Sequence, residues 1–317
     1  MEKPKVSVIM PIYNAERFVE AAITSITAQT YKNFEIVLVD DCSIDNTMEV
    51  IKRIKDDRIK IIHNKKNQGI AYSRNIAIES SCGEYVAIMD DDDIASRNRL
   101  ELEVDFLDRH RDIDVVGGRK CVIDENGEVI RPSRMVYYNP KYIKAKYLFQ
   151  NVFHNGTVMF RRKPIMQNGI SYKNAYLGME DYRFWVECSK VVQMSNIDEI
   201  FLYHREYENN ETSRVSREAN DERRRLYSEI QRFSLWASGY HLEENELMLL
   251  TEVLKEKNGC YKNKEEMQAF YDVLCKILRQ SQEMNCDNLK EIELVCKELF
   301  AEKTKNARFL WNNVMES

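Results

Sequence analysis

The first half of the chain alternates between two hydrophobic patterns, and this alternation limits the possible folds more than any other feature. Short apolar runs, several of them rich in β-branched residues as buried strands are, occur at residues 5–11, 34–40, 58–64, 84–90 and 114–124. Between them, apolar residues recur at helical spacing, for example in residues 14–30, 69–81 and 97–110. Strand alternating with helix predicts an α/β fold with a mainly parallel, doubly wound sheet covered by helices on both faces.

The rest of the chain divides into a mixed region and a helical region. Residues 125–217 contain a turn in DENGEV, strand-like segments near 156–162 and 199–207, and a short helix near 179–192. From residue 218 onward, apolar residues recur at helical spacing, with very few glycines or prolines. We therefore expect an α/β domain at residues 1–217 and an all-helical C-terminal region at residues 218–317.

Composition argues against several classes of protein. The formal net charge of −5 does not favour nucleic-acid binding, which needs basic surfaces. The eight cysteines show no zinc-ligand spacing and are expected to be reduced thiols. No apolar run reaches the roughly 18 residues that a membrane-spanning helix needs. We therefore expect a cytoplasmic protein whose contact with the inner face of the cell membrane is at most peripheral.

Polar residues follow the ends of the first four strand-like runs. Ligands of doubly wound sheets bind beyond the carboxyl ends of the strands. These ends lie at residues 11–14, at 40–41, near 64 and at 90–93, so their side chains should converge on one rim of the sheet. The sequence therefore predicts a binding site on that rim.

Four consecutive aspartates, Asp90 to Asp93, follow the fourth strand-like run directly. Adjacent carboxylates repel one another, so the row is favourable only in water or beside a cation. Mg²⁺ and Mn²⁺ prefer oxygen ligands and often take one or two carboxylates, with phosphate and water oxygens completing the shell. In an extended chain, Asp90 and Asp92 would share one side and Asp91 and Asp93 the other. The alternative is a cap with solvated acids before the next helix.

Three further groups of residues are site candidates. Asp41 is placed to accept the ring N–H of a nucleobase or to cap the following helix. Asn67 and Arg74 lie near the same rim, where Arg74 can bond to acids or phosphates. A carboxylate in the pair Glu180–Asp181 is suited to act as a general base, although acids at a helix start are also common caps. The isolated histidines His154 and His204 are weaker candidates, because such histidines are more often structural.

These segments, in this order, resemble glycosyltransferase family 2, the inverting enzymes with the GT-A fold. The matching segments are VSVIMPIYN at 6–14, QTYKNFEIVLVDDCSIDNT at 29–47, NQGIAYSRN at 67–75, GEYVAIMDDDDIASRNRL at 83–100 and GMEDYRFWVE at 178–187. The resemblance covers residues 5–217 and leaves the helical region outside. It implies a Rossmann-like GT-A sheet and a nucleotide-sugar donor, most often a UDP-sugar, bound across the first four strand ends.

The resemblance also implies roles for the donor-side residues. Pro11, Tyr13 and Asp41 would border the nucleobase, with Arg74 and Asn67 close by. Asp90 and Asp91 fall where the family contacts ribose and sugar.

Matching of the same motifs implies a metal ligand and a catalytic base. Asp92, the last acid of the D-x-D element, falls on the ligand of Mn²⁺ or Mg²⁺, and Asp90 and His204 are further candidate ligands. Asp181 matches the base, with Glu180 beside it to orient the acceptor. In the implied single displacement, Asp181 deprotonates an acceptor hydroxyl whose oxygen attacks the anomeric carbon, and the nucleoside diphosphate leaves with its charge stabilised by the metal.

Two departures from the family pattern affect these expectations. The four aspartates leave the register of the D-x-D element ambiguous by one residue, so Asp91 and Asp93 are alternative metal ligands. The Q-x-x-R-W element of processive relatives is absent, because QRFSLW at 231–236 has a different spacing. We expect a non-processive enzyme that adds one sugar to a saccharide or lipid-linked oligosaccharide. The segment NVFHNGTVMFRR at 151–162 resembles the acceptor side of bacterial enzymes that build surface polysaccharides.

Two other functions compete with this interpretation. A sugar nucleotidyltransferase normally carries a glycine-rich loop after the first strand, and PIYNAERF at 11–18 contains no glycine. A non-catalytic scaffold subunit would not need Asp92 and Asp181. The helical region is a candidate surface for self-association, for docking on a partner, or for reaching lipid-linked acceptors.

Overall fold

The computed structural model describes residues 3–132, 137–207, 220–255 and 264–304. It forms two units, one comprising Met1–Tyr138 and Phe153–Glu218 and the other comprising Asn139–Val152 and Ala219–Ser317.

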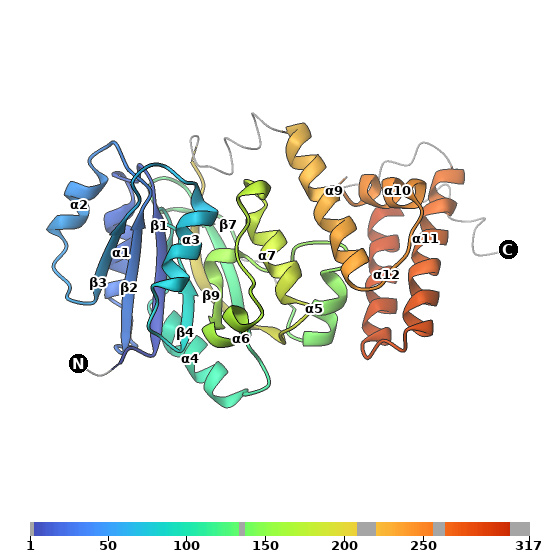
Figure 1. Cartoon of the computed structure of the whole chain (residues 1–317), viewed down its shortest axis with the longest axis horizontal. Helices are drawn as coiled ribbons and strands as arrows, with labels where there is room; N and C mark the ends of the chain where they lie inside the picture. Colours follow the sequence, from blue (N-terminus) through green and yellow to red (C-terminus); the bar gives the residue numbers. More distant parts are fainter. Residues whose placement is uncertain (1–2, 133–136, 208–219, 256–263, 305–317) are drawn as a thin grey trace. The chain divides into compact units, whose positions relative to one another are not determined.

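A nine-stranded sheet in the order β3-β2-β1-β4-β8-β6-β9-β5, with β7 paired to β6, is the centre of the first unit (Figure 1). Its first four strands are parallel, as the alternating sequence predicts: β1 (Val6–Ile12), β2 (Phe34–Asp40), β3 (Ile59–His63) and β4 (Tyr85–Ile88). Their carboxyl ends therefore meet at one rim, which confirms the predicted convergence.

The other half of the sheet is mixed. Its strands are β5 (Ile94–Ala95), β6 (Val115–Ile123), β7 (Val129–Arg131), β8 (Met159–Arg161) and β9 (Met194–Arg205). The strand β8 runs antiparallel to both β4 and β6, whereas β6 and β9 are parallel. The predicted α/β sheet is confirmed, but it is mixed because β8 enters in the reverse direction.

Helices cover both faces of the parallel strands. Even-numbered residues of β1, such as Val8 and Met10, pack with Ile23 and Ile26 of one helix in a buried core, while Ile9 is buried on the opposite face. The unit's helices are α1 (Val19–Thr27), α2 (Thr47–Arg53), α3 (Ile70–Glu79), α4 (Arg99–Arg109), α6 (Arg162–Gln167) and α7 (Glu180–Cys188). Short 3₁₀ turns occur at η1 (Asn155–Thr157) and η2 (Asn174–Tyr176).

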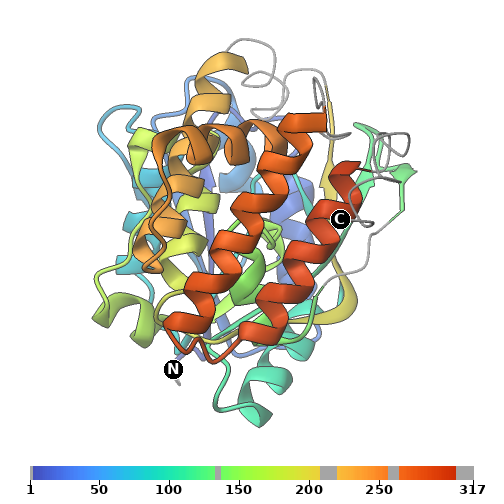
Figure 2. The ribbon, with the colours of Figure 1, turned by 90° about the vertical axis from the view of Figure 1, so that its right-hand side faces the viewer.

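The second unit is helical. It contains α5 (Pro140–Lys146), α9 (Asn220–Ala237), α10 (Glu244–Lys255), α11 (Lys264–Glu283) and α12 (Leu289–Thr304). Figures 1 and 2 show α11 and α12 side by side, and Phe270, Ile277, Val295 and Leu299 lie in their shared core. Within the described ranges, no helix is long and apolar enough to span a membrane.

One segment groups differently from the predicted division at residue 217. The prediction placed all of residues 1–217 in one domain, but Asn139–Val152 belongs to the helical unit. The reason is its apolar face: Tyr142, Ala145, Leu148 and Phe149 pack into the core of the helices that follow residue 219. The predicted boundary itself lies outside the described residues.

Candidate active site

The loops after β1 and β2 are tied together at the rim. The backbone N–H of Asn14 donates to Ser43 Oγ at 3.1 Å, and Asn14 Oδ1 accepts from the N–H of Ile44 at 2.9 Å. Asn14 and Cys42 both adopt positive φ angles, of 50° and 66°, which are uncommon for residues other than glycine and are often found at functional sites. The two strand ends are therefore held in one defined arrangement beside Tyr13, which is 46% exposed.

Asp41 organises the loop before α3. Its carboxylate accepts hydrogen bonds from Asn64 Nδ2 at 2.6 Å and from the N–H groups of Gln68 and Gly69 at 2.9 and 2.8 Å. Gly69 has a φ of +89°, which a glycine adopts without strain. Asp41 thus fixes the loop that carries Asn67, whose side chain is exposed at the rim.

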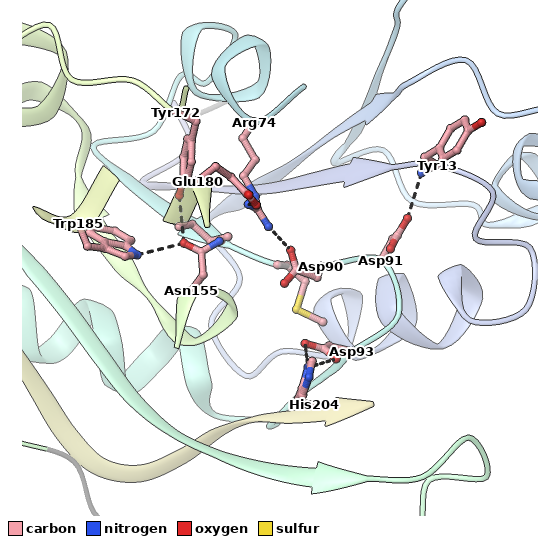
Figure 3. A network of polar contacts seen from close by, with 12 residues as sticks. Tyr13, Arg74, Asp90, Asp91, Asp93, Asn155, Tyr172, Glu180, Trp185 and His204 are labelled. Atoms are coloured by element: carbon pink, nitrogen blue, oxygen red, sulfur yellow. Dashed lines mark hydrogen bonds and ion pairs between the residues drawn. The ribbon is translucent and has the colours of Figure 1, made fainter. Parts of the chain in front are cut away.

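Each of the four aspartates has a different partner, and Figure 3 shows the partners of Asp90, Asp91 and Asp93. Asp90 accepts from Arg74, and Asp91 accepts from the N–H of Tyr13 at 3.1 Å. Asp92 hydrogen-bonds to the Tyr207 hydroxyl.

Asp93 is nearly fully buried. It hydrogen-bonds to His204 Nδ1 at 3.1 Å and accepts from the N–H of Arg205 at 2.8 Å.

Two local expectations for this row are wrong. Asp91 and Asp92 form a turn and not an extended chain, so their side chains do not alternate in two pairs. None of the four aspartates caps the following helix either, because the short strand β5 intervenes and the N-cap position of α4 is occupied by Asn98. The row reverses direction at its centre, which is why each carboxylate meets a different element.

The two aspartates in the middle of the row, Asp91 and Asp92, lie where their charged forms are disfavoured. Burial, followed by the charges of Asp90 and Asp93, raises the pKa of Asp91 to about 7. Burial and the three neighbouring carboxylates likewise raise the pKa of Asp92 well above its ordinary value. A divalent cation would relieve this repulsion, so the donor set fits one.

The number of protein ligands at such a cation is small. Among the described residues, no group of three or more His, Cys, Asp or Glu side chains is arranged to hold a metal. The predicted ligands Asp90 and His204 also have other partners, since Asp90 pairs with Arg74 and His204 Nδ1 faces Asp93. A cation beside Asp92 would therefore need further oxygen ligands from outside these side chains, such as water or a phosphate.

Arg74 connects the rim of the sheet, at the end of β4, to α7. Its guanidinium is 4% exposed and bonds to Asp90 and Glu180, each at 2.9 Å. It lies 5.3 Å from the centroid of the Tyr172 ring, which stacks on Phe184 at 4.1 Å. Arg74 therefore lies beside the end of β4, and its partners are two carboxylates.

The acid pair Glu180–Asp181 begins α7. Glu180 is buried against Arg74, whereas Asp181 is only partly buried and accepts a 2.7 Å hydrogen bond from the N–H of Tyr182. The positive end of the helix dipole favours an ionised carboxylate at this position. The two acids therefore differ in setting: Glu180 is bonded to Arg74 in the interior, whereas Asp181 is partly exposed at the start of α7.

Sequence reasoning missed several residues of this region. Asn155 Oδ1 accepts from both the Tyr172 hydroxyl and Trp185 Nε1 at 3.1 Å, which ties η1 to α7 (Figure 3). A Cβ on Gly156 would lie 2.8 Å from Leu202 Cδ2 and 3.5 and 3.6 Å from the Oδ2 atoms of Asp90 and Asp93, so this turn lies directly against β9 and the aspartates. The resemblance of residues 151–162 to an acceptor-side segment was the only signal for these residues, and Tyr207 had none.

Comparisons with known proteins agree with this geometry. The model of the family "Glycosyl transferase family 2" matches residues 7–169. An uncharacterized glycosyltransferase of Haemophilus influenzae is 34% identical over 235 residues, covering 71% of this chain and 73% of the relative. The Escherichia coli UDP-Glc:alpha-D-GlcNAc-diphosphoundecaprenol beta-1,3-glucosyltransferase WfgD is 36% identical over 140 residues, covering 43% of this chain and 55% of that protein.

Solved structures share the fold. S. aureus TarS 1-349 in complex with UDP-GlcNAc has a TM-score of 0.63 at 18% identity and covers 98% of this chain and 92% of its own. The mannosyltransferase PcManGT from Pyrobaculum calidifontis, in complex with GDP-Man and Mn²⁺, has a TM-score of 0.55 at 18% identity, with coverages of 99% and 89%. From its matched sequence and its sheet, the chain belongs to glycosyltransferase family 2 and is a glycosyltransferase with the GT-A fold.

Proposed function

We propose that this enzyme transfers one sugar, with inversion and with the help of a divalent cation, from a UDP-sugar to a hydroxyl of a saccharide or lipid-linked oligosaccharide. The observation that carries the proposal is the position of Arg74, which joins the acid row to the helix of the candidate base through Asp90 and Glu180. The name of WfgD, which specifies a UDP-sugar and a lipid-linked acceptor, supports both substrate classes.

On the donor side, the rim offers a surface for the nucleotide. Buried Pro11 lies just before the end of β1 at Ile12, exposed Tyr13 follows the strand, and Asp91 is bonded to the backbone of Tyr13. We propose that the nucleobase binds against Pro11, Tyr13 and the loop around Asn67, which Asp41 holds in place. The ribose and the sugar would then contact Asp90 and Asp91.

The cation site that we propose centres on Asp92. Asp93 is nearly fully buried and bonded, which leaves Asp92 as the more accessible of the two carboxylates. Asp90 of the same row and His204, which contacts Asp93, are further candidate ligands. Mn²⁺ or Mg²⁺ bound there would stabilise the negative charge that develops on the departing diphosphate. The Asp93 carboxylate would orient the His204 ring through Nδ1, leaving Nε2 as the nitrogen that can serve as a ligand.

The residue that we assign as the base is Asp181. Its carboxylate takes the proton of the acceptor hydroxyl, and that oxygen forms a bond to the anomeric carbon as the bond from this carbon to the diphosphate oxygen breaks. Attack from the side opposite the leaving group inverts the configuration. Glu180 does not exchange a proton in this scheme, because its charge is held by Arg74.

A panel of nucleotide sugars tests the proposal. UDP-glucose, UDP-galactose, UDP-GlcNAc and GDP-mannose are each added with Mn²⁺ or with EDTA, and thermal stabilisation and release of the nucleoside diphosphate are measured. We expect one UDP-sugar to stabilise the protein and to be hydrolysed slowly, and only with the cation. Equal behaviour in Mn²⁺ and EDTA would contradict the metal dependence, and preference for GDP-mannose would contradict the donor.

A further inference from the structure

Lys120 of β6 faces the acid row. In the parallel pairing of β6 with β9, Lys120 lies beside Leu202, and Val122 lies beside His204. Side chains at alternate positions and at paired positions share one face of a sheet. His204 contacts Asp93, and Leu202 lies against Gly156, whose added Cβ would be 3.5 Å from Asp90 Oδ2. Two neighbours thus place Lys120 on the side of the aspartates.

The other cations around the row already have partners. The Arg74 guanidinium bonds to Asp90 and Glu180. The Arg205 guanidinium donates to the backbone carbonyls of Asp92, Asp124 and Glu125. In contrast, no described residue forms a hydrogen bond or a salt bridge with the Lys120 ammonium, whose side chain is half-buried.

A half-buried ammonium that makes no hydrogen bond or salt bridge raises the free energy of the folded protein. Burial lowers the pKa of Lys120 below its ordinary value, although the charges of Asp93, Glu206 and Asp181 act to raise it. These three acids extend from the proposed cation site to the proposed base, and the charge of Arg131 opposes their effect, so the ammonium lies near several carboxylates without bonding to them. A group of this kind is suited to meet a charged ligand that arrives later.

We propose that Lys120 Nζ binds a phosphate oxygen of the substrate in the active site. This inference rests on the proposed function. The phosphate oxygen can belong to either of two substrates: the diphosphate of the nucleotide-sugar donor or the diphosphate of a lipid-linked acceptor. On the donor side, the ammonium would hold the β-phosphate as it leaves with its added charge. On the acceptor side, it would fix the acceptor sugar near Asp181.

The test compares Lys120→Met with Lys60→Met. Lys60 is exposed on β3 and donates only to the backbone carbonyl of Ser80, so this control removes the same charge away from the site. Calorimetry measures binding of UDP with Mn²⁺, of uridine, and of farnesyl diphosphate as a probe for the acceptor's diphosphate. Melting temperatures verify that both variants are folded, and Lys120→Arg tests whether a cation of different shape restores binding.

We expect Lys120→Met to bind one of the two diphosphates about 10-fold more weakly than Lys60→Met does, with uridine affinity unchanged. Weaker binding of UDP would show that Lys120 binds the diphosphate of the donor. Weaker binding of farnesyl diphosphate would show that it binds the diphosphate of the acceptor. Unchanged affinity for both, an equal loss for uridine, or a wild type that binds neither diphosphate would overturn the inference. If the wild type binds UDP and Lys120→Met does so equally well, the proposed donor stands and the role of Lys120 on the donor side fails.

Discussion

Arg74 and Glu180 lie 106 residues apart in the chain, yet Arg74 Nη1 donates a 2.9 Å hydrogen bond to Glu180 Oε1 in a buried setting. The same guanidinium reaches Asp90 through Nη2. The two bonds place one cation between two carboxylates. The Arg74 guanidinium therefore compensates the charge of Asp90, in the row of four aspartates, and the charge of Glu180, at the start of α7. A disturbance at either acid is expected to be transmitted to the other.

Replacing Arg74 with Met should destabilise the first unit by about 3 kcal/mol, because Glu180 would remain buried, and Asp90 partly buried, without a counter-charge. Urea unfolding measures the loss. The double variant Arg74→Met with Glu180→Gln removes one of the stranded charges and should recover part of that energy. If the effects of the two substitutions simply add, the pair is not energetically coupled.

Replacing Asp181 with Asn should lower turnover at least about 100-fold while UDP–Mn²⁺ affinity stays within about 2-fold, because only the proton acceptor is lost. Turnover is followed by release of the nucleoside diphosphate and affinity by calorimetry. Glu187→Gln is the matched control on the same helix, where Glu187 pairs with Arg183 and should not affect transfer. Wild-type turnover in Asp181→Asn would show that another group is the base.

Replacing Asp92 with Asn should weaken Mn²⁺-dependent UDP binding about 10-fold or more, while binding of UDP in EDTA changes little. Asp93→Asn is the informative comparison, since Asp93 holds His204 and should affect cation affinity less. Unchanged affinity in Asp92→Asn, with a loss in Asp93→Asn, would shift the cation ligand by one residue.

Binding of UDP–Mn²⁺ should weaken as the pH falls from 8 to 6. The pKa of Asp91 is raised to about 7 by burial and by its neighbours, so a proton competes with the cation below that value. Because the folded state holds this proton more tightly than the unfolded state, the ligand-free protein should gain stability over the same fall in pH. Calorimetry in two buffers of different ionisation enthalpy counts the protons released on binding.

The variant Asp91→Asn checks the origin of this pH dependence. The charge of Asp91 is one cause of the raised pKa of Asp92, so its removal should shift the midpoint of binding to lower pH. A midpoint that stays in place would assign the proton to a different group.

The sequence by itself determined that the first four strands alternate with helices and are parallel, that their ends share one rim, and that acids lie on it. These follow from local signals, because the periods of strands and helices and the residues at strand ends are set within a few positions of one another. For the same reason, the motifs identified the family before any contact was known, and Arg74 and the Glu180–Asp181 pair were expected at the site.

Only the tertiary structure decided which groups meet. The partners of Asp91 and Asp93 lie 78 and 111 residues away, and the turn at Asp91–Asp92 sends each carboxylate to a different element. The direction of Lys120 depends on the register of β6 against β9, which shifts between Arg119 and Lys120. Such pairings arise when distant strands close into one sheet, and a register that changes by one residue turns every side chain to the other face.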